Sequence, residues 1–156
     1  MQEPSKQQVD LAVDWMRQYQ RAQCREKLAR AELEQARDGV LRLSHPLQGM
    51  PQPTGSHSDR TALAAERLDL ARRACSTAAV RTRMAREAVE QAIAGVEDIT
   101  LQELLRRRYL LGETLGQVAR EIGMDYRWVR RLHRRAVVRA VPVEVLVPEV
   151  RKAGTL

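Results

Sequence analysis

The residues with the clearest chemical potential are six arginines between Arg127 and Arg139, a stretch without any acidic residue. A guanidinium group has forked donors that can pair with guanine O6 and N7 in the major groove, or contact phosphates. A helix face that is merely solvated would normally mix both signs of charge. The stretch therefore predicts a nucleic-acid-binding surface, and the alternative is a charged helical hairpin packed inside a bundle.

Two short helices joined by a tight turn are expected to position these arginines. Thr114 and Gln117 match the capping-box pattern that begins a helix. Gly123 can adopt the left-handed backbone conformation at which that helix ends, and Asp125 can cap the next one. The pattern predicts a helix, a turn and a second helix, with the arginines on the second.

The apolar residues of this motif predict how the two helices pack. Val118 and Ala119 are expected to be buried on the first helix, and Ala119 is small enough for the second helix to pass close over it. Val129 and Leu132, three residues apart, would form the buried face of the second helix. The remaining face of the second helix would then point to solvent.

The candidate DNA-binding residues are divided by their place on the second helix. Its first two turns would sit deepest in a major groove, where Arg127, Arg130 and Arg131 could reach bases. Arginines further out are expected to contact phosphates, and each arginine could instead be solvated. The full set of candidates is Tyr126, Arg127, Arg130, Arg131, Arg134, Arg135, Arg106, Arg107 and Arg108.

A helix before this motif would complete a three-helix domain over residues 98–140. Thr100 and Glu103 match a second capping box, and the helix is expected to stop at Gly112. Its apolar face is formed by Leu101, Leu104, Leu105 and Leu110. We expect this domain to fold on its own. The tail, residues 141–156, is expected to be flexible, or else a short extended segment.

Residues 1–97 predict two long helices, over residues 6–40 and 60–95, with Asp59 capping the second. Each has an apolar seam with alternating spacings of three and four, typical of a coiled coil or helical hairpin. The seams are Trp15, Tyr19, Ala22, Glu26, Ala29, Leu33, Ala36 and Val40, and Leu68, Ala71, Cys75, Ala78, Thr82, Ala85, Val89, Ala92 and Val96. Seams rich in alanine bury little area, so a homodimer through these helices is an attractive possibility.

Residues 43–59 contain three prolines and two glycines and are expected to form a loop between the long helices. The loop is either a flexible connector or a clip that contacts polymerase, DNA or a second protomer.

Charge and composition narrow the function. The net charge is +7 over 156 residues. Residues 98–156 carry twelve basic and seven acidic residues, against fifteen and thirteen in residues 1–97. The basic excess thus lies with the arginine-rich helix, which favours a nucleic-acid partner. No phosphate-binding loop, paired acid–base motif or clustered metal ligand occurs, so we expect neither an enzyme nor a cofactor. Cys24 and Cys75 are expected to be reduced.

Part of the sequence resembles a known family. GETLGQVAREIGMDYRWVRRLHRRAV (residues 112–137) is similar to the helix-turn-helix of region 4 of bacterial sigma factors. The order of a helix around Trp15 and Tyr19, the loop GMPQPTGSHSD, a second long helix, RRRYLLGETLGQVA and WVRRLHRRAV resembles phage-encoded regulators of the RinA/ArpU type, which activate late, packaging or lysis genes. The resemblance implies a transcriptional regulator that binds double-stranded DNA and contacts RNA polymerase.

The expected function is therefore sequence-specific transcriptional regulation in the cytoplasm of a bacterial host, without a membrane partner. Two alternatives remain. A small terminase-like component of phage DNA packaging would also join a helix-turn-helix to helical oligomerisation elements. A coiled-coil adaptor would use its basic end only for solubility.

Overall fold

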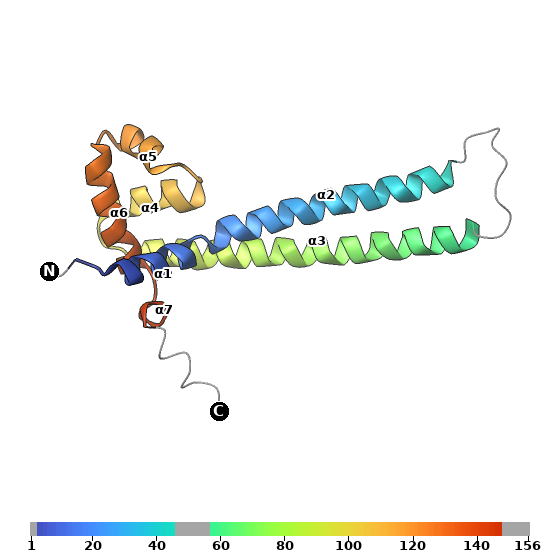
Figure 1. The fold of residues 1–156 in the computed structure, drawn as a ribbon, viewed down its shortest axis with the longest axis horizontal. Helices are drawn as coiled ribbons and strands as arrows, with labels where there is room; N and C mark the ends of the chain where they lie inside the picture. Colours follow the sequence, from blue (N-terminus) through green and yellow to red (C-terminus); the bar gives the residue numbers. More distant parts are fainter. Residues whose placement is uncertain (1–2, 46–56, 148–156) are drawn as a thin grey trace, which may run out of the picture. The chain divides into compact units, whose positions relative to one another are not determined.

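A computed structural model describes residues 3–45 and 57–147 of the chain (Figure 1). These residues form helices and no strand, so the all-α fold class is confirmed. In chain order the elements are α1 (Lys6–Met16), α2 (Gln18–Ser44), α3 (His57–Ala94), α4 (Ile99–Leu105), the π-helix η1 (Arg106–Leu110), α5 (Leu115–Ile122), α6 (Tyr126–Ala140) and α7 (Val143–Leu146).

The chain divides into two compact units. One comprises residues 1–21 and 83–156, and the other comprises residues 22–82. The boundary predicted at residue 97 is not where the structure divides, because α1 packs against α6 and α7. The single helix predicted over residues 6–40 is also interrupted, at Arg17, where α1 ends.

The first unit has one hydrophobic core that joins α1, the C-terminal part of α3 and the helices from α4 to α6. Met16, Val89, Ile93 and Leu104 are fully buried in it. α1 begins with a capping box, in which the backbone N–H of Gln8 donates to the Ser5 hydroxyl. The core of this unit therefore depends on residues that lie far from the arginine-rich helix in the sequence.

In the second unit, α2 and α3 lie side by side (Figure 1) and bury the predicted seam residues. Ala22, Ala29, Leu33 and Thr82 are buried, and the remaining seam residues of this unit are half-buried. The alternation of three- and four-residue spacings thus predicted the inward face of both helices. Glu26, the polar interruption, is half-buried and its carboxylate pairs with Arg30 at 2.5 Å.

The helices on both sides extend into the range predicted to be a loop, residues 43–59. α2 continues to Ser44 and α3 already begins at His57, so Asp59 lies in the first turn of α3 and does not cap it. An acidic residue is favourable in a first turn because it complements the helix dipole. The two interpretations of the loop, a connector or a clip, fall on residues 46–56, which lie outside the described residues.

The start of the helix that precedes the helix-turn-helix motif differs from expectation, whereas its end near Gly112 does not. α4 is capped by Asp98, whose carboxylate accepts hydrogen bonds from the backbone N–H groups of Thr100 (2.8 Å) and Leu101 (3.3 Å). The capping box predicted at Thr100 is therefore wrong. α4 then widens into η1, where the Arg108 carbonyl accepts a hydrogen bond from the Gln20 side chain at 2.9 Å. The polypeptide turns at Gly112, which has φ +76°.

The prediction of a flexible tail over residues 141–156 is wrong for residues 141–147. Val141 is buried, and the short helix α7 that follows packs against α1 through Val145 and Leu146. Burial of these apolar side chains gives the segment a fixed place that its composition did not indicate. The rest of the predicted tail, residues 148–156, lies outside the described residues.

None of the helices in the described part of the chain is long and apolar enough to cross a membrane.

Candidate nucleic-acid interface

The turn between α5 and α6 has the backbone geometry that its sequence predicts. Gly123 adopts φ +67° and ψ +33°, the left-handed conformation that disfavours residues with a Cβ atom. The N–H of Met124 donates to the Ala119 carbonyl at 2.9 Å, which closes the end of α5. At the other end of α5, the predicted capping box of Thr114 and Gln117 is present.

Asp125 caps α6, as predicted. Its carboxylate accepts hydrogen bonds from the backbone N–H groups of Arg127 at 2.9 Å and Trp128 at 3.3 Å. These bonds satisfy two of the donors that a helix start leaves free. The first turn of α6, which carries Tyr126 and Arg127, is therefore fixed by local hydrogen bonds.

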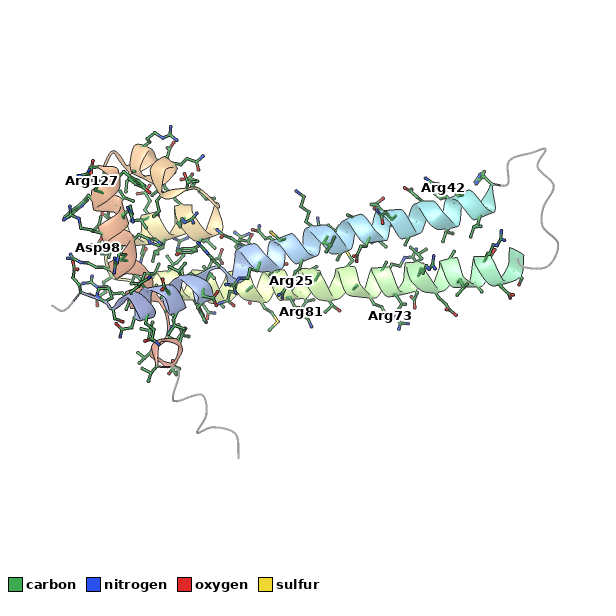
Figure 2. The ribbon with its side chains drawn as sticks, in the orientation of Figure 1. Arg25, Arg42, Arg73, Arg81, Asp98 and Arg127 are labelled. Carbon is green, nitrogen blue, oxygen red and sulfur yellow. The ribbon has the colours of Figure 1, made fainter. Side chains whose placement is uncertain are left out.

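The buried face of α6 turns its arginines to solvent (Figure 2 labels Arg127). Val129, Ala136 and Val137 are fully buried, and α6 packs against α1, α4 and α5. Leu132, predicted to be buried, is half-buried, and the neighbouring His133 takes the interior position. The exposed residues are Tyr126, Arg127, Trp128, Arg130, Arg131, Arg134, Arg135 and Arg139.

Four of these arginines share one surface. Arg127, Arg130, Arg131 and Arg134 line a hollow of about 180 Å³ on the outside of α6. Their positions follow the three- and four-residue spacing that places helix residues on one face. None of the four forms an ion pair with an acidic residue among the described residues. Their charge is therefore not neutralised within the described chain.

Two aromatic side chains support arginines of this surface. The guanidinium of Arg130 lies 5.9 Å from the centroid of the Tyr126 ring, and that of Arg131 lies 5.5 Å from Trp128. Such cation–π contacts restrict the arginine side chain without neutralising it. Trp128 was not among the predicted site residues. Its position three residues before Arg131 was the available sequence signal.

The other predicted arginines are placed differently. Arg135 pairs with Glu3 at 3.5 Å, at the beginning of the chain. Arg106 is exposed on η1. Arg108 donates to the Glu113 carbonyl at 2.9 Å and lies 6.0 Å from the Tyr109 ring centroid.

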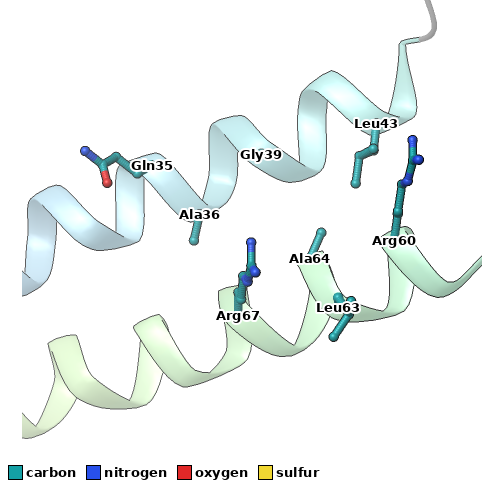
Figure 3. A pocket seen from close by; sticks show the side chains of 8 residues that line it. All are labelled: Gln35, Ala36, Gly39, Leu43, Arg60, Leu63, Ala64 and Arg67. Atoms are coloured by element: carbon teal, nitrogen blue, oxygen red, sulfur yellow. The ribbon is translucent and has the colours of Figure 1, made fainter. Parts of the chain in front are cut away.

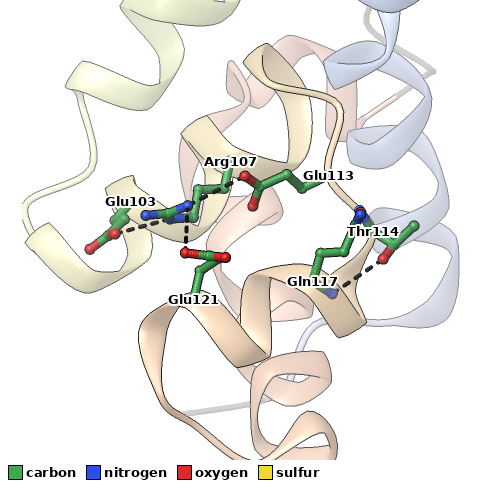
Figure 4. Close-up of polar contacts among 6 residues, drawn as sticks. All are labelled: Glu103, Arg107, Glu113, Thr114, Gln117 and Glu121. Carbon is green, nitrogen blue, oxygen red and sulfur yellow. Dashed lines mark hydrogen bonds and ion pairs between the residues drawn. The ribbon is translucent and has the colours of Figure 1, made fainter.

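Arg107 is the centre of an ion-pair cluster (Figure 4). Its guanidinium lies 3.0 Å from Glu103, 3.3 Å from Glu113 and 3.8 Å from Glu121. The hydrogen bond to Glu103 is the main reason why the pKa of Arg107 is raised above its ordinary value. Arg107 thus holds α4, η1 and α5 together, and its donors are directed to carboxylates of the same chain.

A buried polar pair lies beneath the arginine surface. The Tyr109 hydroxyl and His133 Nε2 are 2.8 Å apart, and the two rings are stacked with centroids 5.8 Å apart. Burial raises the pKa of Tyr109 to about 12 and lowers that of His133 to about 4. Both side chains are therefore neutral near pH 7. No local pattern predicts this pair, because the two residues are 24 positions apart on different helices.

Comparisons with protein-family models, with curated proteins and with solved structures find no match for this chain. Among the described residues, no three His, Cys, Asp or Glu side chains are grouped so that they could hold a metal ion.

Proposed function

We propose that the chain is a sequence-specific DNA-binding transcriptional regulator whose α6 enters the major groove. The observation that carries the proposal is the surface formed by Arg127, Arg130, Arg131 and Arg134, which has no acidic ion-pair partner among the described residues. A helix is about 10–12 Å wide and the major groove is about 12 Å wide, so the whole arginine face of α6 can be inserted.

The arginines have different proposed roles. Arg127, Arg130 and Arg131 lie in the first two turns of α6, the part of a recognition helix that contacts base edges. The rings of Tyr126 and Trp128 hold two of these side chains, so less conformational entropy is lost when they bind. Arg134, Arg135 and Arg106 are proposed to contact phosphates. Arg107 and Arg108 are not part of the proposed interface, because they donate to groups within the chain.

Single alanine substitutions should separate these roles. Arg130→Ala should cost about 1–3 kcal/mol on the preferred duplex and relax base preference at one or two positions. Arg134→Ala should lower the affinity for all duplexes alike. It should also reduce the slope of log K against log salt by about one. The measurement is a set of binding isotherms on a duplex selected from random sequences and on a scrambled duplex. Equal effects of both substitutions on both duplexes would contradict the assignment of roles.

Arg107→Ala provides the matched control, because it removes an arginine close to the site that has an internal role. It should lower the free energy of unfolding without a specific effect on base preference.

The family resemblance supports the remaining parts of the proposal: a phage-encoded regulator that acts in the bacterial cytoplasm and contacts RNA polymerase. A homodimer through the long helices is part of the same proposal. Sedimentation of the full chain separates this reading from the packaging alternative, since a monomer or dimer is expected of a regulator. A ring of eight or more subunits would favour a terminase-like component.

A further inference from the structure

One face of the α2–α3 unit carries a continuous groove. Three hollows of about 390, 460 and 240 Å³ follow one another between residues 22–43 of α2 and 60–81 of α3. The first and second share Gln35, Ala36 and Arg67, and the second and third share Ala74. Figure 3 shows the first hollow, with side chains of both helices around it. The hollows therefore belong to one surface feature.

The floor of the groove is apolar and open to solvent. It is formed mainly by small residues, which leave room between the helices, and by leucines at its edge. Leu63 and Leu70 are 53% and 64% exposed, so they contribute apolar area that the chain leaves uncovered. The small residues of the floor include Ala36, Gly39, Ala64, Ala71, Ala74 and Ala78.

The rim of the groove is basic. Arg25, Arg60, Arg67 and Arg81 line it, with Glu32 as the single acidic residue. Figure 2 labels Arg25 on α2 and Arg81 on α3. None of these four arginines has an ion-pair or hydrogen-bond partner within the described ranges. Their donors are available to a ligand.

The charge of the unit is concentrated at this groove. Its described residues include ten arginine and lysine residues and seven acidic ones, and four basic and one acidic residue line the groove. The described residues of the unit that do not line the groove include six basic and six acidic residues, so their charges cancel. The excess positive charge of the unit therefore lies beside its exposed apolar floor.

We propose that this groove binds an acidic amphipathic α-helix of a partner protein. Leucine-sized side chains on one face of such a helix would fill the space above the small residues, as in other helix-in-groove complexes. Glutamate or aspartate on its flanks would pair with the rim arginines. The contact would bury Leu63 and Leu70, and it would convert the pair of helices into a three-helix arrangement.

Two other occupants fit less well. Duplex DNA would pair with the arginines but has no apolar ridge to cover the leucines and alanines. A second copy of the chain would have to supply α2 or α3. Each of these helices has two more basic than acidic residues, so the basic rim of the groove would repel it. The homodimer proposed above would therefore use another face of the long helices.

The test uses the full-length protein and a fluorescent helical peptide. The peptide has about 22 residues, enough to follow residues 60–81 of α3. It carries leucine at three- and four-residue spacing and glutamate on both flanks, and a control peptide has lysine in place of glutamate. We expect saturable binding of the acidic peptide in fluorescence anisotropy, and weaker binding of the lysine peptide by about tenfold or more.

Matched variants locate the binding. The double substitution Arg67→Glu with Arg81→Glu should lower the affinity for the acidic peptide by about tenfold. Arg72→Glu makes one such charge reversal on an exposed residue of α3 that does not line the groove, and it should leave binding unchanged. Circular dichroism should show the same helix content for all three proteins, since every substituted side chain is on the surface.

Several results would overturn the proposal: no binding of the acidic peptide, equal binding of both peptides, or an equal effect of Arg72→Glu. Competition of duplex DNA with the peptide, abolished by Arg67→Glu and Arg81→Glu, would identify the groove as a DNA surface. Loss of a homodimer in the same variant would assign it to a second copy. DNA binding through α6 can persist or fail independently of these results.

Discussion

Deletion of residues 1–17 is expected to unfold the region from α4 to α7 and to abolish duplex binding. The deletion removes α1, whose Val9, Ala12 and Met16 are buried in the core that supports α6. Burial of one such valine or methionine is worth about 1.5–3 kcal/mol. The summed loss of about 5 kcal/mol is comparable to the whole stability of a typical domain, about 5–15 kcal/mol.

Single substitutions make the same point without removing a helix. Met16→Ala should lower the free energy of unfolding by about 2–5 kcal/mol, measured by urea denaturation. Asp10→Ala changes an exposed residue of the same helix and should have little effect. For the same reason, the isolated fragment 98–140 should be unfolded by circular dichroism, contrary to our expectation from the sequence. A folded fragment would show that α1 is dispensable.

Acidification from pH 7 to pH 4 is expected to lower the free energy of unfolding by about 3 kcal/mol through His133 alone. Burial is the main reason why the pKa of its imidazole is lowered from 6.5 to about 4, and charge repulsion from Arg108 and Arg17 contributes to the same shift. Above pH 6.5 the side chain is neutral in both states, so it has no effect. Below pH 6.5 the unfolded chain binds a proton that the folded chain does not, and stability falls until about pH 4.

The variant His133→Gln separates this effect from other titrating groups. Glutamine is neutral throughout this pH range. Between pH 7 and pH 4 the free energy of unfolding should therefore fall by about 3 kcal/mol less in the variant than in the wild type. Its neighbour Tyr109 does not contribute, because its pKa is raised to about 12. The measurement is urea denaturation of both proteins at several pH values. Parallel loss of stability in the two proteins would contradict the assignment to His133.

Local patterns in the sequence predicted local structure well. The hydroxyl of Thr114, the carboxylate of Asp125 and the left-handed conformation of Gly123 act within three or four residues, so spacing alone indicates them. The inward faces of α2 and α3 were likewise fixed by apolar periodicity. The start of α4 was missed because Asp98 and Thr100 are both good caps, and the sequence does not show which one is used.

Contacts between distant segments could not be predicted. The packing of α1 against α6 joins residues more than a hundred positions apart, and the sequence of neither helix indicates which helix it packs against. The same holds for the hydrogen bond from Gln20 to Arg108. Arg107 was assigned to the interface from charge alone. Glu103 is a local partner four residues before it, but Glu113 and Glu121 are brought to it by the turn after η1 and by α5.

The salt dependence of duplex binding shows whether α6 of this protein binds DNA through its arginines. Wild-type affinity should fall steeply with salt, with a slope of about −3 or steeper in a plot of log K against log salt. A variant with alanine at Arg127, Arg130, Arg131 and Arg134 should keep its helix content and lose at least about a hundredfold in affinity. Weak binding with a slope near zero, or equal affinity of the variant, would contradict the assignment of α6 as a DNA-binding helix.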